Sequence, residues 1–304
     1  MKTIKNPIAD FRKQFGTHEL CYQYLADSKW KNGYRCTKCN SVDYRKGNMH
    51  LERRCKSCGY NESPLAGTLF HSMKIPLEVA FEMVYRISVN KKGISSIALS
   101  REYNVNQKTA YTFKQKVQLC MKSSGNNPLE GIVHVDEFVY GGPDEGCPGR
   151  SSESDKLKVC IAVEMRTDKK GHQNAGRMYA LPLENYSSDE LKKMFDTHIS
   201  KEAEVVTDKW SGYIPLKKEY KIEQLESDKG GNFPILHAII MNLKGWIRGI
   251  HHSIDKIHLS KYLNEFCFRF NRRNFIDNMH NFILKRMVLS KPILIKSINR
   301  REYG

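Results

Sequence analysis

Two aspartates in similar local contexts are the side chains of this sequence best suited to catalysis. Asp136 lies in the segment Gly131-Ile-Val-His-Val-Asp-Glu-Phe-Val-Tyr140, and Asp208 lies in Glu204-Val-Val-Thr-Asp-Lys-Trp-Ser-Gly-Tyr213. In both segments the residue types alternate and β-branched residues are frequent. This pattern favours strands, which hold a carboxylate rigidly. Two such carboxylates can bind divalent cations, and two cations about 3.5–4 Å apart stabilise the attacking and leaving oxygens of a phosphoryl transfer. The pair therefore predicts a metal-dependent enzyme that acts on nucleic acid.

Four cysteines form a second set with the spacing of a metal site, Cys36-x2-Cys39 and Cys55-x2-Cys58. Each pair directs two thiolates at one centre, and two pairs complete the tetrahedron of a structural zinc site. Four thiolates leave no open position for water, so a catalytic zinc is not expected. A redox dithiol is the alternative. The other five cysteines lack such spacing and are expected to be buried or incidental: Cys21, Cys120, Cys147, Cys160 and Cys267.

The composition points to a polyanionic partner. The 304 residues include 50 Lys and Arg against 33 Asp and Glu, a formal net charge of +17. Such a charge attracts nucleic acid, and the alternative is a merely solvated basic surface. We expect no membrane association, because no apolar stretch of about 20 residues occurs and the N-terminus lacks a signal-peptide core. Nine cysteines without such a signal agree with a reducing cytosol. A cytoplasmic, nucleoid-associated protein is expected.

The elements that must position the aspartates form an α/β pattern. The predicted strands and the helix among them are Ile132–Tyr140, Leu157–Met165, Met178–Pro182, the helix Ser188–Ser200, and Glu204–Thr207. Three successive strands, a helix and a strand make a mixed sheet. This is the order of the ribonuclease-H-like fold, in which carboxylates on the first and fourth strands lie side by side. Asp136 and Asp208 occupy those places.

A pair of short helices is predicted before this sheet. Residues 94–103 and 104–117 have helical periodicity with a polar turn between them, which resembles a helix-turn-helix. The second helix carries Lys108, Tyr111 and Lys114, which could contact bases and phosphates. The alternative is an ordinary helical hairpin between two domains.

Several motifs occur in one order along the chain. After the four cysteines come Leu65-Ala-Gly-Thr-Leu-Phe-His71, Lys74-Ile-Pro-Leu77, Val135-Asp-Glu-Phe138 with Gly141-Gly142, Thr207-Asp-Lys-Trp-Ser-Gly-Tyr213, and His258-Leu-Ser-Lys-Tyr-Leu-Asn-Glu-Phe-Cys-Phe-Arg-Phe-Asn-Arg-Arg273. In this order they resemble an insertion-sequence DDE transposase with an N-terminal zinc ribbon, over residues about 15 to 275.

The resemblance implies a third metal-coordinating residue on the helix after the fourth strand, followed seven positions later by a lysine or arginine. The predicted helix Ile235–Trp246 contains no carboxylate, but His237 stands seven positions before Lys244. Seven residues are nearly two turns, so both side chains share one face. We assign His237 as the third ligand, a position where the family tolerates histidine or asparagine, and Lys244 as a contact to DNA phosphate.

The catalytic ions implied are Mg²⁺ or Mn²⁺, and an imidazole ligand suits Mn²⁺ better. The rival third ligand is Glu265, with Arg272 also seven positions later. His237 is favoured because it lies only 29 positions after Asp208. The alternatives without a catalytic role are that His237 is partly buried in a helix core and that Lys244 is an ordinary solvated lysine.

Further residues are expected to contact DNA or to flank the site. Trp210 could stack on bases near a cleaved end, or pack in the core. Phosphate neutralisation is assigned to Arg269, Arg272, Arg273 and the tail residues Lys285, Arg286, Lys291, Lys296, Arg300 and Arg301, with a solvated surface as the alternative. Glu137 is predicted to point to the opposite strand face and not to be a ligand. Residues 141–155 are expected to form a mobile loop near the site.

Four parts are predicted: an N-terminal helix and zinc ribbon (1–72), a helix-turn-helix region (73–125), a ribonuclease-H-like catalytic domain (126–280) and a basic C-terminal tail (281–304). The resemblance implies a DNA transposase of a bacterial insertion sequence. Such an enzyme cleaves transposon ends and joins the 3′-hydroxyl to target DNA by two-metal phosphoryl transfer. Double-stranded DNA is the expected partner, and a homodimer or higher oligomer is expected on it. The alternatives are a ribonuclease-H-like nuclease without strand transfer and a catalytically inert zinc-ribbon DNA-binding protein derived from a transposase.

Overall fold

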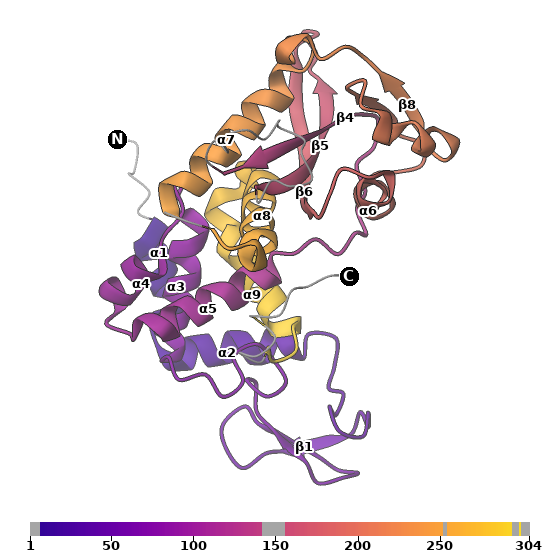
Figure 1. The fold of residues 1–304 in the computed structure, drawn as a ribbon. Coiled ribbons are helices and arrows are strands. Elements are labelled where there is room, and N and C mark those ends of the chain that lie inside the picture. The colour runs from indigo at the N-terminus through magenta and orange to yellow at the C-terminus, as the bar shows by residue number, and fades with distance from the viewer. Residues whose placement is uncertain (1–6, 142–155, 252–253, 294–297, 299–304) are drawn as a thin grey trace. The chain divides into compact units, whose positions relative to one another are not determined.

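The computed structural model of the protein describes residues 7–141, 156–251, 254–293 and 298 (Figure 1). These residues form two compact units. The N-terminal unit comprises residues up to 121 together with a C-terminal segment that begins at 274, and the second unit comprises residues 122–273. Most of the loop predicted at 141–155, and the tail residues Lys296, Arg300 and Arg301, lie outside the described residues.

The N-terminal unit is built mainly of helices. They are α1 (Pro7–Phe15), α2 (His18–Lys29), α3 (Leu77–Val89), α4 (Ser96–Tyr103), α5 (Gln107–Cys120) and α9 (Met279–Leu289). Aromatic rings from three of these helices pack together. Phe11 of α1 lies 4.5 Å from Tyr85 of α3 and 5.2 Å from His280 of α9, between ring centroids. Helix α9 is therefore part of this core, although most of its residues fall within the predicted basic tail at 281–304.

Side-chain caps define the two short helices predicted between residues 94 and 117. Ser95 caps the start of α4, and Asn104 ends it in the left-handed region at φ 50°, donating its backbone N–H to the Ser100 carbonyl. Asn106 then begins α5, where its side chain accepts the backbone N–H of Lys108. Two helices joined by a short turn are thus confirmed, because each boundary residue satisfies a backbone group that the helix leaves open.

The segment that contains the four cysteines forms a small antiparallel sheet in the same unit. Its strands are β1 (Tyr44–Lys46), β2 (Arg53–Cys55) and β3 (Asn61–Glu62), in that order. The fully buried carboxylate of Glu62 lies 2.7 Å from the ammonium group of Lys29 on α2. It also accepts the backbone N–H of Thr37 at 3.4 Å. One buried ion pair therefore ties α2, β3 and the first cysteine loop together.

The second unit contains a mixed five-stranded sheet. The strands are β4 (Ile132–Tyr140), β5 (Leu157–Thr167), β6 (Gln173–Leu183), β7 (Glu204–Thr207) and β8 (Lys221–Gln224). The sheet order is β6-β5-β4-β7-β8, with β4, β5 and β6 antiparallel and β4, β7 and β8 parallel. This arrangement is consistent with the ribonuclease-H-like fold and confirms the predicted fold class. Strands β4 and β7 have the predicted bounds.

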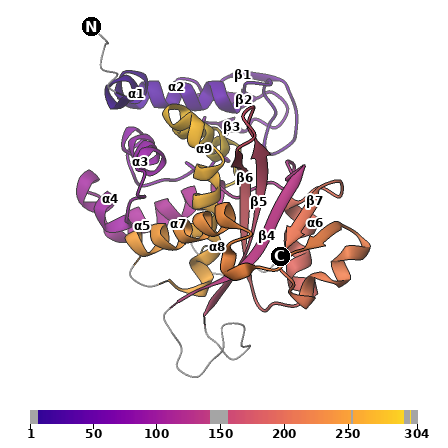
Figure 2. The same ribbon diagram turned by 90° about the horizontal axis from the view of Figure 1, so that it is seen from above.

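Helices cover both faces of this sheet. Helix α6 (Ser188–His198) packs on one face, whereas α7 (Pro234–Ile250) and α8 (Lys256–Phe270) pack on the other (Figure 2). The period of two along β4 divides its side chains accordingly. Val133 and Val135 belong to the core beneath α6, and Phe138 belongs to the core beneath α7 and α8. None of the helices in the described ranges is long and apolar enough to cross a membrane.

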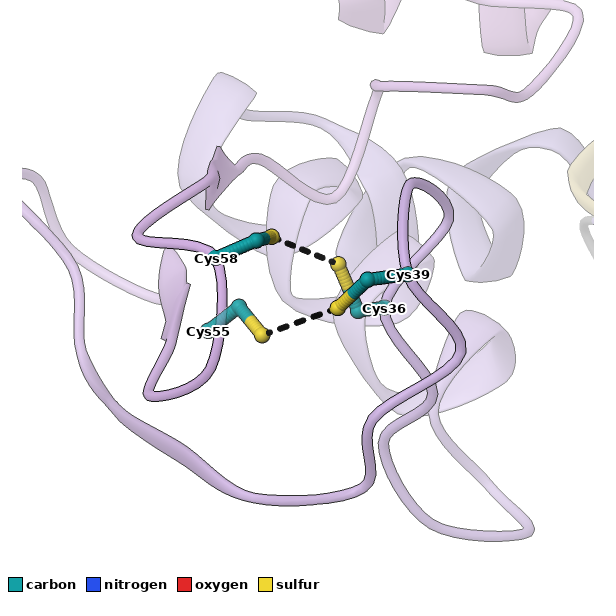
Figure 3. Close-up of side chains that lie close together, drawn as sticks. All are labelled: Cys36, Cys39, Cys55 and Cys58. Atoms are coloured by element: carbon teal, nitrogen blue, oxygen red, sulfur yellow. Dashed lines mark hydrogen bonds between the residues drawn. The ribbon is translucent and has the colours of Figure 1, made fainter.

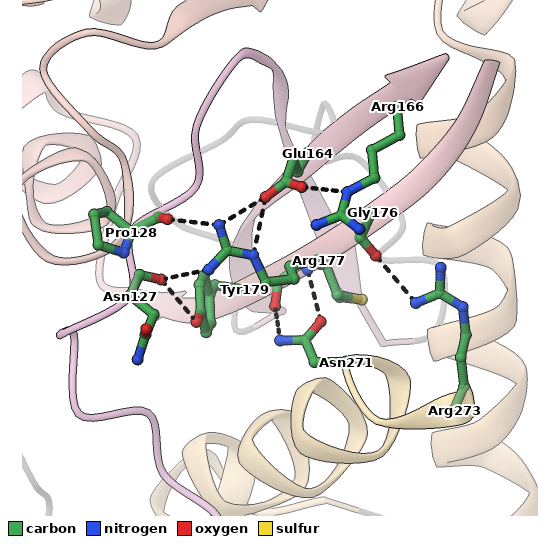
Figure 4. A network of polar contacts seen from close by, with 10 residues as sticks. Asn127, Pro128, Glu164, Arg166, Gly176, Arg177, Tyr179, Asn271 and Arg273 are labelled. Atoms are coloured by element: carbon green, nitrogen blue, oxygen red, sulfur yellow. Dashed lines mark hydrogen bonds and ion pairs between the residues drawn. The ribbon is translucent and has the colours of Figure 1, made fainter. Parts of the chain in front are cut away.

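A polar network ties the chain entering this unit to the sheet (Figure 4). The buried carboxylate of Glu164 on β5 accepts from Arg177 on β6 at 2.8 Å and from Arg166 at 2.6 Å. Arg177 also donates to the backbone carbonyls of Asn127 and Pro128, at 3.2 and 2.8 Å. One guanidinium group therefore satisfies a buried carboxylate and two carbonyls of the linker.

The end of α8 is held against β6 in the same view (Figure 4). The Asn271 side chain accepts the backbone N–H of Met178 at 2.8 Å and donates to its carbonyl at 2.9 Å, as a neighbouring strand would. Arg273 donates to the Gly176 carbonyl at 3.0 Å. These contacts fix α8 beside a strand whose pairing with β5 is irregular between Val163 and Met165.

The two arginines that contact Glu164 give a matched test of this network. We expect Arg177→Met to lower the free energy of unfolding by at least about 2 kcal/mol, because it removes a donor from two linker carbonyls and from the buried carboxylate of Glu164. Arg166→Met should cost no more than about 1 kcal/mol, since the Arg166 side chain is 62% exposed. Urea unfolding of the two variants measures both values. Equal losses would show that Arg177 does not hold the linker.

Candidate functional site

The parallel pairing of β4 with β7 brings the two aspartates together. Val135 of β4 is in register with Thr207 of β7, so the next residue of each strand is an aspartate. In-register parallel neighbours point to the same face of a sheet. A carboxylate oxygen from each of Asp136, Glu137 and Asp208 lies within 4.8 Å of the other two. The result is a compact acidic cluster in the middle of the sheet.

Asp136 is oriented by its own strand and by α7. One carboxylate oxygen accepts the backbone N–H of Glu137 at 2.8 Å. The other oxygen lies 3.5 Å from Nε2 of His237 on α7. The Asp136 side chain is 17% exposed, so it is largely enclosed but still open to a ligand.

The loop after β7 is held by hydrogen bonds that orient Asp208. The Asp208 carboxylate accepts the backbone N–H of Trp210 at 3.0 Å. The side-chain amide of Gln224 on β8 donates to the carbonyls of Asp208 and Trp210, at 3.0 and 2.9 Å. Our sequence interpretation overlooked Gln224. The available signal was a polar residue at the end of the strand after the one that leads to Asp208.

Helix α7 presents His237 and Lys244 to β4. His237 lies beside Asp136, and the Lys244 ammonium group lies 5.2 Å from the centre of the Phe138 ring. Partial burial lowers the pKa of Lys244, and the negative charge of Asp136 acts in the opposite direction. The two residues share the helix face that faces β4, which is the geometry that the seven-residue spacing predicted.

Glu137 joins the acidic cluster although strand alternation predicted that it points away. Its buried side chain lies on the α6 side, next to Tyr213. Burial raises the pKa of the Tyr213 hydroxyl, and the charge of Glu137 raises it further. The Asp136 carboxylate turns back toward the backbone N–H of Glu137, which brings the two carboxylates near one another despite their opposite faces. Glu137 is thus an additional candidate ligand that sequence reasoning set aside.

Glu265, the rival third ligand, lies in a different environment. It is fully buried on α8, and Arg269 approaches its carboxylate to 3.4 Å. In the described part of the chain, the acidic cluster around Asp136 does not include it. Of the two alternatives that the spacing allowed, His237 is therefore the residue beside Asp136.

Most residues predicted to contact DNA in the second unit make internal contacts. The indole N–H of Trp210 donates to the Tyr186 carbonyl at 3.1 Å, and the ring packs against the core beneath α6. Arg272 donates to the Phe268 carbonyl at 3.3 Å, in addition to the contacts of Arg269 and Arg273 already described. These contacts favour the core-packing alternative for Trp210. The DNA contacts of all four residues remain predictions.

The predicted DNA-contacting residues of α5 differ in accessibility. Lys108, in the first turn, is exposed, and Tyr111 is half-buried. Lys114 is only 2% exposed, because it stands on the part of the helix where Phe113 and Val117 are also buried. Lys108 is therefore the residue of the three that is best placed to reach a phosphate.

The four cysteine sulfurs converge from two loops of the N-terminal unit (Figure 3). Sulfur to sulfur, Cys36 is 3.6 Å from Cys58, and Cys39 is 3.6 Å from Cys55. Zinc–sulfur bonds of about 2.3 Å form a tetrahedron with edges of about 3.8 Å, so the cluster has the size of a structural zinc site.

The thiol pKa values in the cluster show why it needs a cation. Desolvation alone raises the pKa of Cys36, but backbone N–H groups of Cys39 and Lys38 lower it to about 6. The N–H of Tyr60 lowers the pKa of Cys58, but desolvation and the other thiols bring it to about 12. Four adjacent thiolates therefore repel one another unless a metal ion neutralises them.

A ribonuclease-H-like sheet that brings two aspartates together on neighbouring parallel strands is the arrangement found in the DDE class of transposase domains. Comparison with known families makes the assignment specific, because residues 128–271 match the ISXO2-like transposase domain. This part of the chain belongs to that family. A relative from Halobacterium salinarum, described as an uncharacterized protein in transposable element ISH50, is 24% identical over 284 residues. The match covers 84% of this chain and 92% of the relative.

Metal removal tests the cysteine cluster. We expect the purified protein to hold about one zinc ion per chain, and a strong chelator to unfold the ribbon, because such metals contribute about 10–16 kcal/mol to the folding of small zinc modules. Zinc analysis and limited proteolysis within residues 30–62 are the measurements. Cys36→Ser should lose the metal, whereas Cys120→Ala, outside the cluster, should retain it. Full zinc content in Cys36→Ser would contradict the assignment.

Proposed function

We propose that the protein is a DNA transposase that cleaves phosphodiester bonds at transposon ends and joins the resulting 3′-hydroxyl to target DNA. The observation that carries this proposal is the acidic cluster of Asp136 and Asp208, with His237 3.5 Å from Asp136, inside a transposase domain. The chemistry needs no covalent protein nucleophile, because water or a DNA hydroxyl attacks the phosphorus.

The donor set suits divalent ions. Carboxylate oxygens of Asp136 and Asp208 are hard ligands of the kind that Mg²⁺ and Mn²⁺ prefer, and His237 adds an imidazole, which favours Mn²⁺. When bound, such ions supply an activated nucleophile and stabilise the leaving oxygen. The hydrogen bonds from Glu137 and Trp210 hold the two aspartates before a ligand arrives. Lys244, half-buried on the same helix face as His237, is positioned to neutralise a phosphate oxygen.

The zinc ribbon supports a role in binding DNA. Arg45 faces Arg54, and Lys46 faces Arg53, across the antiparallel pair β1–β2. Like charges directly opposite each other destabilise a sheet, so this arrangement favours an anionic partner that covers them. With a net charge of +17, the chain suits double-stranded DNA, which the ribbon and Lys108 would contact. Joining two transposon ends to one target further favours a dimer or higher oligomer on DNA.

Substitution of either aspartate tests the proposed chemistry. We expect Asp136→Asn and Asp208→Asn each to lower cleavage of labelled end DNA about a thousand-fold in Mg²⁺ or Mn²⁺, because metal ions supply several kcal/mol of transition-state stabilisation. Glu202→Gln, which neutralises an exposed carboxylate paired with Lys221, is the control and should retain activity. An assay with 3′-hydroxyl ends and a plasmid target separates a transposase from a nuclease without strand transfer.

The same assay decides the third ligand. His237→Ala should lose activity and fold normally, whereas Glu265→Gln should alter stability more than the chemistry, since Glu265 is buried with Arg269. Cleavage of end DNA by the Asp136→Asn variant at the wild-type rate would contradict the proposed mechanism. A wild-type protein that binds ends without cutting them would instead identify the inert relative.

Salt dependence tests the ribbon. Lys46→Ala should reduce the steepness of the fall in DNA affinity with salt by about 0.9 on logarithmic axes, the value for one lost phosphate contact. Lys193→Ala removes the same charge from an exposed lysine paired with Glu190 and should leave the slope unchanged. Binding titrations at several salt concentrations measure both slopes. Identical slopes for the two variants would contradict the proposal that the ribbon contacts DNA.

A further inference from the structure

The imidazole of His237 occupies the space beside a glycine in the turn before α7. The turn is the short 3₁₀ helix η3 (Asp228–Gly230), and Gly230 has φ +93°. A Cβ atom built on Gly230 would lie 2.8 Å from Nδ1 and 2.9 Å from Cε1 of His237. Real Cβ atoms do not approach other atoms so closely, so the ring occupies the space that any other residue would fill.

Hydrogen bonds fix the turn to the first turn of α7. The Gly230 carbonyl accepts the N–H of Phe233 at 3.0 Å, and the Phe233 carbonyl accepts the N–H of His237 at 3.0 Å. The Phe233 ring is buried and meets the His134 ring edge-on, with 5.3 Å between centroids. His134 lies on β4, two residues before Asp136. The backbone that carries Gly230 is thus anchored to the strand that carries Asp136.

We infer that Gly230 is a positioning residue for His237. The imidazole lies between Gly230, where a Cβ would meet its Nδ1 and Cε1 atoms, and Asp136, which lies 3.5 Å from Nε2. A histidine ligand needs one nitrogen directed at the metal, and contacts on its other edge set that direction. Here the effect is steric, because the missing side chain of Gly230 leaves the space that the ring occupies. The inference rests on the proposed role of His237.

A second glycine distinguishes the steric effect of a side chain at Gly230 from the effect of backbone strain. Gly171 also has a positive φ, +85°, but a Cβ built there would meet no atom within 4 Å. Alanine is strained at both positions, because L-residues rarely adopt such φ values. Only at Gly230 would the added methyl group displace His237. Gly171→Ala is therefore a matched control.

The test measures Mn²⁺ binding to the full chain. Pulsed electron paramagnetic resonance detects nitrogen coupled to bound Mn²⁺, and a titration gives the affinity. We expect coupling in the wild type and in Gly171→Ala. Gly230→Ala should lose the coupling and bind Mn²⁺ about 10- to 100-fold more weakly, as when a partner that orients a ligand is lost. In a His237→Ala background, Gly230→Ala should change the affinity less than about twofold, because the contact is already gone.

The outcomes separate the inference from the proposed function. Coupling retained in Gly230→Ala at wild-type affinity overturns the inference alone. Mn²⁺ binding that depends on Asp136 but shows no nitrogen coupling in the wild type overturns the role of His237, and the inference with it. If Gly230→Ala is less stable than Gly171→Ala, His237→Ala should rescue the excess loss by removing the clashing ring, because backbone strain is common to both glycines. Absence of that rescue, read from the urea midpoint of the double variant, also overturns the inference.

Discussion

The parallel register between β4 and β7 is the constraint on which the candidate site depends. It aligns Val135 with Thr207 and therefore places Asp136 beside Asp208, although 72 positions separate the two aspartates in the chain. A shift by one residue would turn one carboxylate to the opposite face of the sheet. The amide of Gln224 then holds the loop that follows β7 through the carbonyls of Asp208 and Trp210.

The sequence predicted the sheet because its signals are local. Alternation over Ile132–Tyr140 and a capped helix at Ser188 identify their elements without knowledge of the rest of the chain. The sequence interpretation missed Gln224 and Gly230, because their roles depend on tertiary contacts that residue spacing does not reveal. Glu137 was set aside because strand alternation describes Cβ directions, whereas the Asp136 carboxylate turns back toward the Glu137 backbone and so comes near the Glu137 carboxylate.

Helix α7 serves the core and the site at once. Leu236 and Leu243 are buried in the core beneath it, and each is followed directly by a residue of the site, His237 or Lys244. The rotation of α7 about its own axis therefore determines both the packing of its buried face and the direction of its site residues. A cavity made under Leu243 would turn or shift the helix, and the spacing between His237 and Asp136 would change with it. Packing and chemistry are consequently difficult to vary independently in this helix.

The like-charged pairs on the ribbon have a consequence for how the module responds to its surroundings. Repulsion between Arg45 and Arg54, and between Lys46 and Arg53, opposes closure of the hairpin, and dissolved ions weaken that repulsion. The same ions compete with the ribbon for phosphate. Higher ionic strength thus has opposite effects on the free and the DNA-bound hairpin. It stabilises the free hairpin and weakens the binding of the hairpin to DNA.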